Sequence, residues 1–374
     1  MTKLATTWIT AHDSFAALAA SWNSLAALTD DKSVFLRHEW FAAAWAWRSH
    51  ESSLAILCVQ RGEQIIGILP LVLEQRRLYS LTSRCLTSFD LPDTQEFSLL
   101  CAPDDAAVVA DSVCAEIARN SLSIDWLQLR KLGPTAANTV LLNGLSNGKR
   151  VAIGGADACA CVGLDEPWEA YYARRSRRLK KGNNLIAKKL KGAFKNVEIQ
   201  RVELDASAAA AAALQELCKL AENSWKKELP TGLSKPIPRK WADALRQTLG
   251  SAGSMCAWTL RLDGALAAAE LQLEKSGMVS ALRADTAEEF DKFGTGTYLG
   301  WKVLEALMNG TRVVYNMGPG LNEYKERWAE RRVELSTANV FAATLKGRLL
   351  WSLDYKLKPL AKRIAERFRK APQS

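Results

Sequence analysis

The sequence predicts a mixed α/β fold in which one supersecondary unit is used twice. Hairpin signals, each a pair of apolar runs around a polar turn, occur at 54–74 and again at 255–274. Each hairpin is followed by a helical segment and a further strand, an order that combines antiparallel pairing with a helix-to-strand crossover. The chain has 374 residues. Because a single hydrophobic core rarely grows past about 250–300 residues, the length favours two units.

The elements of the first half follow from periodicity and turn chemistry. Apolar residues at helical spacing predict a helix over 14–28, and the aromatic-rich segment 38–49 predicts a second helix whose rings lie in the core. Apolar runs at 54–60 and 65–74 flank Arg61–Gly62, as in a β-hairpin. The remaining expected elements are an irregular stretch at 80–97, a helix at 105–120 and a strand at 125–133.

The second half repeats this order about 200 residues later. Strands are predicted at 255–261 and 265–274 around Asp263–Gly264, a strong hairpin turn, and a third strand at 278–285. The half closes with a helix at 296–309, a helix-terminating Gly310 and a strand at 312–318.

A helical connector joins the two halves. It begins near Glu166, passes a short strand at 197–204 and enters an Ala-rich helix at 206–224. Segment 229–238 holds three prolines and a glycine, so we expect a surface loop there that is suited to act as a lid.

The formal charge of +10 is concentrated in two segments. Residues 174–195 hold ten Lys/Arg and no Asp/Glu, and residues 346–374 hold nine Lys/Arg and two acidic residues. The rest of the chain carries 31 basic and 38 acidic residues, so it is mildly acidic. An argument from charge about anionic partners therefore concerns those two segments.

Cysteine and histidine placement argues against a metal site. The eight cysteines form no CxxC pair and lie mostly in apolar contexts, and the three histidines all fall within the first 50 residues. We therefore expect no metal cofactor. No window approaches 18 uninterrupted apolar residues, and the amino terminus lacks the apolar run of a signal peptide. These patterns predict a soluble, reduced, cytoplasmic protein.

A glycine-containing turn precedes the predicted helix at 296–309. Gly294 and Gly296 would leave the backbone N–H groups of the first helical turn unpaired, and such a helix terminus attracts anions. A tight turn with an ordinary helix cap explains the same glycines.

A polar and aromatic cluster follows the strand at 312–318. Ligands in α/β sheets tend to bind beyond the carboxyl ends of strands, so this cluster and the glycine turn are expected to flank one crevice. Packing of Tyr324 and Trp328 on one face of a short helix is the alternative. The cluster consists of Gly318–Pro319–Gly320, Asn322, Tyr324, Lys325 and Trp328.

These residues carry a resemblance to a known family. Gly296–Leu299, Gly310, Gly318–Gly320 and Tyr324–Trp328 resemble the carboxy-terminal signature of GNAT-superfamily acyltransferases grouped with cellulose-biosynthesis acetyltransferases, which are relatives of the Fem-type aminoacyl transferases. The likeness extends over about residues 15–335. Further matching features are Trp22, Leu25, Ser33, Phe35, Glu39–Trp40, Leu69–Leu71 and Tyr172 leading into Arg174–Lys181.

The resemblance implies tandem GNAT-like domains at 1–165 and 166–345, followed by a basic amphipathic tail at 346–374. It also implies a donor site in the second domain, with an acyl-CoA or acyl carrier protein thioester as co-substrate. The residues implied for donor binding are Gly294, Gly296, Thr297, Tyr298 and Leu299. Asp291 stands where the general GNAT phosphate loop has Arg or Gln, and its charge disfavours the phosphates of coenzyme A.

Acyl transfer to an amine or hydroxyl requires a base, an oxyanion donor and an acid for the departing thiolate. Tyr324 is the expected acid or oxyanion donor, because the family signature includes it. Glu270 and Asp285 are the candidate bases, although each also suits an exposed surface carboxylate. Asn322, Lys325 and Trp328 are the expected substrate-binding residues. Because no nucleophile–histidine arrangement is present, a covalent acyl-enzyme is disfavoured.

The basic segments leave several partners open. Segment 174–195 lacks interleaved aromatics, so nucleic acid is disfavoured and a solvated helix or a docking surface for an acidic carrier protein is preferred. In the tail, apolar residues at helical spacing among lysines and arginines suit either an anionic membrane, contacted through 346–370, or packing on the body. The function expected is an acyltransferase acting on an envelope polysaccharide precursor; the alternatives are an aminoacyl-tRNA-dependent Fem-like transferase and a non-enzymatic scaffold at the membrane.

Overall fold

Two β-sheets organise the computed structural model, which describes residues 4–29 and 33–358. In this described part, the smaller sheet has four strands in the order β1 (Leu4–Ile9), β3 (Ile56–Arg61), β4 (Gln64–Leu69) and β7 (Leu100–Cys101). The larger sheet has eleven, in the order β10 (Val197–Glu203), β11 (Met255–Leu262), β12 (Ala265–Lys275), β13 (Met278–Thr286), β14 (Val314–Pro319), β9 (Val151–Gly163), β15 (Arg331–Phe341), β8 (Trp126–Leu132), β6 (Leu81–Ser88), β5 (Leu71–Leu78) and β2 (Ser52–Leu54).

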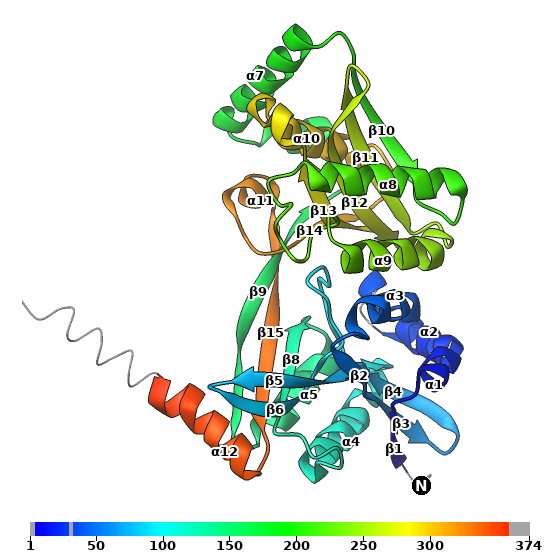
Figure 1. Ribbon diagram of the computed structural model, residues 1–374, viewed down its shortest axis with the longest axis vertical. Helices are drawn as coiled ribbons and strands as arrows, with labels where there is room; N and C mark the ends of the chain where they lie inside the picture. Colours follow the sequence, from blue (N-terminus) through cyan, green and yellow to red (C-terminus); the bar gives the residue numbers. More distant parts are fainter. Residues whose placement is uncertain (1–3, 30–32, 359–374) are drawn as a thin grey trace, which may run out of the picture.

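Most of the helices pack into three hydrophobic cores. Figure 1 shows how these helices are arranged around the sheets. One core joins α1 (His12–Ala17), α2 (Ala19–Leu28) and α3 (His38–Arg48) to α8 (Ala208–Glu222) and α9 (Pro236–Leu245). A second lies under α4 (Ala106–Arg119) and α5 (Ala136–Ser146). The third holds α6 (Trp168–Ala173), α7 (Arg177–Ala193), α10 (Thr295–Met308) and α11 (Glu323–Trp328). The mixed α/β architecture predicted from the sequence is therefore confirmed.

Strands β9 and β15 run side by side between the two halves of the molecule (Figure 1). At one end β9 pairs with β14 of the second half, through Cys159–Gly163. At the other end β15 pairs with β8 of the first half, through Ser336–Phe341. Each strand thus belongs to both halves, and the large sheet is continuous across them. The domain boundary at 165/166 falls just after β9 and stays a prediction.

The helix predicted at 14–28 is divided at Leu18 into α1 and α2, and two further departures in the first half concern its strands. The strand expected at 65–74 is two strands, since β4 ends before Pro70 and β5 continues in the other sheet. Proline has no N–H to donate to a ladder, which favours the break there. The stretch expected to be irregular at 80–97 contains β6, which forms a hairpin with β5.

The second half matches its prediction more closely. Strands β11 and β12 meet at Asp263 and Gly264, whose φ angles of 47° and 87° are those of a tight hairpin turn. The predicted loop at 229–238 is wrong at its end, because α9 begins at Pro236. Proline suits the first position of a helix, where its missing N–H has no partner in any case.

The carboxy-terminal tail begins with α12 (Leu345–Ser352), followed by a wider helical turn at Leu353–Leu357. Leu350 is buried against Trp126 and Phe341, whereas Leu345 is 86% exposed. The last residues of the predicted stripe, Leu360, Ile364 and Phe368, lie outside the described residues.

Candidate functional site

A cavity of about 720 Å³ lies where β13 and β14 part. The two strands pair in parallel only over Met278–Ser280 and Val314–Asn316. Beyond that point the register between β12 and β13 shifts, and Ala281–Asp285 of β13 line the cavity. Tyr315 of β14 and Tyr324 of α11 form part of its wall. A concave site with convergent polar groups at diverging strands is a natural place for a ligand.

Glu270 supplies the buried carboxylate of this cavity. Its side chain comes from β12 and is 7% exposed as a residue. The Tyr315 hydroxyl donates a hydrogen bond of 2.6 Å to Glu270 Oε1, and Gln272 Nε2 donates one of 2.7 Å to the same oxygen. Burial raises the pKa of Glu270, and the two hydrogen bonds oppose that rise. A carboxyl with a raised pKa is suited to general acid and base catalysis.

Tyr324 reaches the cavity from α11 and passes close to α10. A Cβ atom placed on Gly300 would lie 1.9 Å from the Tyr324 hydroxyl, so only glycine at position 300 leaves room for this side chain. Burial raises the pKa of Tyr324, and the charge of Glu270 adds to the rise. The phenol therefore keeps its proton and remains a hydrogen-bond donor.

Two ion pairs also line the cavity. Arg283 of β13 binds Asp93 at 2.6 Å, and the two side chains are only 11% and 9% exposed. Lys226 Nζ lies 3.8 Å from Asp285. Burial raises the pKa of Asp285, and the charge of Lys226 opposes that rise. Because Asp93 belongs to the first half of the chain, the cavity is closed by both halves.

The structure brings together five of the six residues predicted to carry catalysis or bind substrate. Asn322 and Lys325 line the cavity with Glu270, Asp285 and Tyr324. Asn322 Oδ1 also accepts from the Lys325 backbone N–H and so caps α11. Lys325 Nζ donates to the carbonyls of Gly318 and Pro319, and burial lowers the pKa of its amine.

Trp328 lies elsewhere. It is 1% exposed and packs in the third core beside Trp168 and Tyr172. Its ring is not among the groups that line the cavity. Packing, the alternative that the helical spacing allowed, describes its position.

The segment predicted to bind the donor begins α10. Gly294 adopts a φ of 73°, and no side chain caps the helix start. Thr297 lines a second pocket of about 490 Å³ between α7, α10 and α11. Tyr298 and Leu299 point into the third core instead.

The carboxylate of Asp291 is held at the turn before α10. The hydroxyl of Thr286 donates to Asp291 Oδ1 at 2.9 Å, and the Gly294 N–H donates to the Asp291 carbonyl. Asp291 thus remains close to the helix start, where a donor phosphate is expected.

Several groups of the cavity carry no clear signal in the sequence. Asp93 and Lys226 lie far along the chain from the residues that they contact, and no motif marks them. Tyr315 could have been predicted from the sequence. Residues two apart on a strand lie on the same face, so Tyr315 shares a face with Met317, and both line the cavity. In the described ranges no cluster of three or more His, Cys, Asp or Glu is placed to hold a metal ion. No helix in those ranges is long and apolar enough to cross a membrane.

Comparison with known proteins identifies the chemistry of the second half. Residues 180–326 match the family described as "Acetyltransferase (GNAT) domain". This region is a GNAT acetyltransferase domain. Such a domain indicates an acyltransferase enzyme. No curated protein matched the sequence significantly.

Solved structures support the fold over nearly the whole chain. FemX shares 9% identity and a TM-score of 0.62, covering 94% of this chain and 99% of its own. L-PGS from Bacillus licheniformis shares 9% identity and a TM-score of 0.56, covering 89% and 95%. A tandem GNAT protein from the clavulanic acid biosynthesis pathway shares 12% identity and a TM-score of 0.50, covering 91% and 99%. The acyltransferase therefore has a tandem-GNAT fold.

Proposed function

We propose that this acyltransferase moves an acyl group from a thioester donor, acyl-CoA or an acyl carrier protein, to an amine or hydroxyl. The observation that carries the proposal is the grouping of Glu270, Tyr315 and Tyr324 in the cavity where β13 and β14 part. This grouping supports the proposal because it combines a buried carboxyl with a phenol that keeps its proton. Direct transfer needs one group of each kind.

The reaction then proceeds by direct attack. Glu270 removes the proton of the acceptor amine or hydroxyl as its nitrogen or oxygen bonds to the thioester carbon. The Tyr324 hydroxyl donates to the departing sulfur as the carbon–sulfur bond breaks. The thiol leaves with that proton, and the proton held by Glu270 is returned through the solvent to the tyrosine. Asp285, paired with Lys226, is the alternative base.

The donor is proposed to enter beside the start of α10. Backbone N–H groups of the first helical turn and the positive end of the helix dipole favour phosphate there. The Thr297 pocket opens at this point and α11, which carries Tyr324, forms one of its walls. Gly294, Gly296 and Thr297 are the proposed donor-binding residues.

The acceptor is proposed to be a saccharide of an envelope polysaccharide precursor. The resemblance to cellulose-biosynthesis acetyltransferases supports this choice. Polar and paired charged groups from both halves line the acceptor cavity, and such groups suit hydroxyl-rich ligands. The eight cysteines are free thiols, which supports a reducing, cytoplasmic location.

Thiol release from short-chain acyl-CoA and from acylated carrier protein, with amino sugars as acceptors, tests the proposal. We expect Glu270→Gln to lower the rate by about 100-fold or more, since general base catalysis contributes about that much. Glu198→Gln, an exposed carboxylate on β10, is the matched control and should retain full activity. Absence of thioester consumption with both donor classes would contradict the proposal.

An aminoacyl-tRNA-dependent transferase is the second candidate. The near-complete coverage of FemX and the basic helix α7 favour it. In that case tRNA binding must be measurable at low salt and fall steeply as salt is added. A filter-binding titration with total tRNA decides between the donors.

A further inference from the structure

We propose that α7 is a docking surface for an acidic acyl carrier protein, which delivers the acyl donor to the Thr297 pocket beneath it. The inference rests on the proposed function, since it names the carrier of that same donor. It follows from the charge, the apolar centre and the position of one helix.

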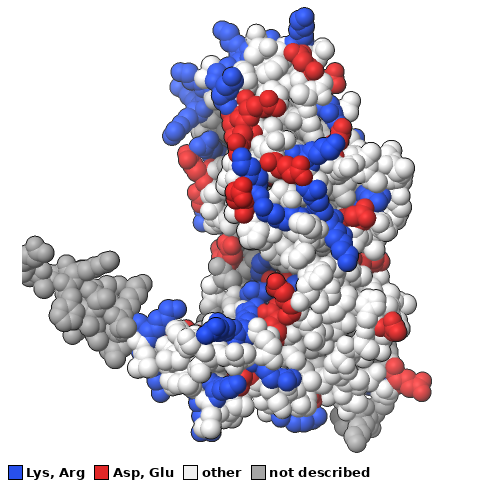
Figure 2. Space-filling view, in the orientation of Figure 1, with Lys and Arg blue, Asp and Glu red and all other residues white. Residues whose placement is uncertain are grey.

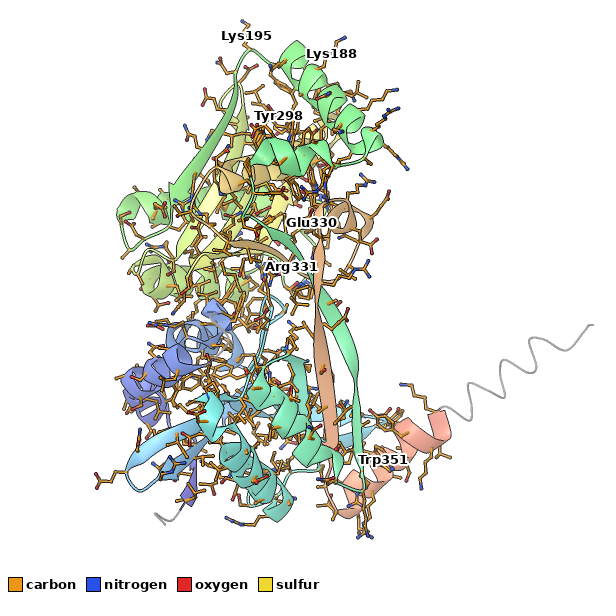
Figure 3. All side chains as sticks on the ribbon, turned by 180° about the vertical axis from the view of Figure 1, so that it is seen from behind. Lys188, Lys195, Tyr298, Glu330, Arg331 and Trp351 are labelled. Atoms are coloured by element: carbon orange, nitrogen blue, oxygen red, sulfur yellow. The ribbon has the colours of Figure 1, made fainter. Side chains whose placement is uncertain are left out.

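The first observation is unpaired positive charge. Helix α7 carries seven Lys or Arg residues and no Asp or Glu. Among the described residues, none of the seven lies within 4 Å of a carboxylate oxygen. Figure 2 shows Lys and Arg side chains gathered over this end of the molecule, and Figure 3 shows Lys188 and Lys195 projecting from it. An acidic protein surface is the complementary partner for such a field.

The second observation is an apolar centre within that charge. Leu185 lies in the middle of α7 and is 62% exposed. Lys181 is four residues before it and Lys188 three residues after it, so all three share one helical face. An apolar contact ringed by charge is the usual anatomy of a protein interface. A nucleic acid backbone gains nothing from Leu185, so the surface favours a protein over tRNA.

The third observation is the position of α7 over the donor site. Ile186 Cδ1 lies 3.1 Å from the point that a Cβ on Gly294 would occupy, so α7 covers the start of α10. Lys189 Nζ donates to the Lys292 carbonyl at 2.9 Å and fixes the helix there. Leu179 and Gly182 of α7 line the Thr297 pocket. A carrier seated on the outer face of α7 would thus be held next to that pocket, and its flexible prosthetic arm would reach the pocket around the helix.

The pocket carries charges of both signs. Glu323 and Glu326 line it together with Arg178 and Arg327, and Arg327 pairs with Glu323. The carboxylate of Asp291, which lies at the adjoining turn, would repel the several phosphates of coenzyme A more than the single phosphodiester of a carrier's arm. The rest of the carrier's recognition would fall on α7.

Steady-state kinetics with two donors test the inference. The probes are acetyl-coenzyme A and an acetyl-loaded acyl carrier protein of the fatty-acid-synthesis type. For the double variant Lys181→Glu/Lys188→Glu, we expect KM for the carrier to rise about tenfold or more, because charges at a docking surface act on encounter and affinity. The kinetic constants with acetyl-coenzyme A should stay within about twofold. Leu185→Asp should raise the carrier KM in the same way.

The control variant, Lys149→Glu/Lys219→Glu, reverses the charge of two exposed lysines elsewhere and should change KM for neither donor. An equal rise in KM for both donors would show that the lysines bind the donor phosphates rather than the carrier. An unchanged KM for both donors would show that α7 is not the docking surface. Each result overturns the inference. Tighter binding of tRNA than of the carrier, lost in the same variant, would also overturn it. Binding of unacylated carrier is measured separately by calorimetry. If the native protein binds the carrier but transfers no acyl group, and the variant does not bind it, the proposed function is refuted while the docking surface on α7 is supported.

Discussion

At the residue scale, the chemistry depends on the environment of one carboxyl group. Glu270 is surrounded by protein and contacts Tyr315 and Gln272. Burial holds its pKa above the ordinary value for glutamate. If Glu270 is the base, kcat/KM will rise with pH as this group loses its proton, with a midpoint above that of an exposed glutamate. In Glu270→Gln that limb of the pH–rate profile should disappear, whereas in Asp285→Asn it should remain.

The same shift makes folding stability depend on pH. Because the pKa of Glu270 is higher in the folded than in the unfolded chain, the folded state binds more protons between the two values. The stability that this provides is complete below the unfolded-state pKa and is lost as pH rises through the folded-state pKa. Urea denaturation over a pH series should show Glu270→Gln gaining stability relative to the native chain above that window. A parallel pH dependence in both proteins would contradict the assignment.

Residue types and their order were enough to predict part of the site. Glu270, Asp285, Tyr324, Asn322 and Lys325 were expected from strand alternation and from the family signature, and the structure places them in one cavity. The partners that tune them were not expected. Asp93 contacts Arg283 across 190 positions of sequence, and no local pattern encodes a contact of that separation.

At the element scale, the approach of α10 to α11 depends on a missing side chain. Gly300→Ala would place a Cβ 1.9 Å from the Tyr324 hydroxyl, so the tyrosine must move. We expect kcat to fall about as far as in Tyr324→Phe, by about tenfold to 100-fold, with a smaller change in donor KM. Gly192→Ala, on α7 with no neighbour within 4 Å, is the control and should retain activity. Full activity in Gly300→Ala would show that the phenol has no fixed role.

Elements were predictable where local signals were strong. The Asp263–Gly264 hairpin, the start of α10 and the aromatic helix α3 all follow from turn chemistry and periodicity. Strand β9 was not predicted, because its sequence is rich in Gly, Ala and Cys, which have little strand preference of their own. Its strand state comes from pairing on both sides with β14 and β15, a tertiary effect.

At the scale of the whole molecule, Arg283 and Asp93 tie the two halves together. Arg283→Met would leave the Asp93 carboxylate buried without its cation, which typically costs about 3–5 kcal/mol. Urea unfolding of Arg283→Met, Asp93→Asn and the double variant should show strong coupling between the two positions. Arg327→Met breaks an exposed pair with Glu323 and should leave the free energy of unfolding nearly unchanged. Additive effects of the two buried substitutions would show that the pair does not join the halves energetically.

We propose that the basic tail contacts an anionic membrane through segment 346–370, and α12 begins this tail. Leu345 and Leu349 are exposed beside Lys346 and Arg348, a combination suited to an anionic bilayer surface. We expect the double variant Leu345→Asp/Leu349→Asp to lower flotation with phosphatidylglycerol vesicles about fivefold or more. Leu28→Asp, at a leucine that is 58% exposed on α2, is the control. Equal flotation of all three proteins would assign the leucines no part in membrane contact.

The continuity of the large sheet limits how the enzyme can be divided. A fragment cut to the 180–326 match would lack β9 and β15, so β14 would present a row of unpaired N–H and C=O groups to solvent. It would also leave Arg283 without Asp93. Such a fragment is expected to aggregate through its open edge. The 180–326 match is thus shorter than the unit that can be purified and assayed, which includes β9 and β15 over their full length.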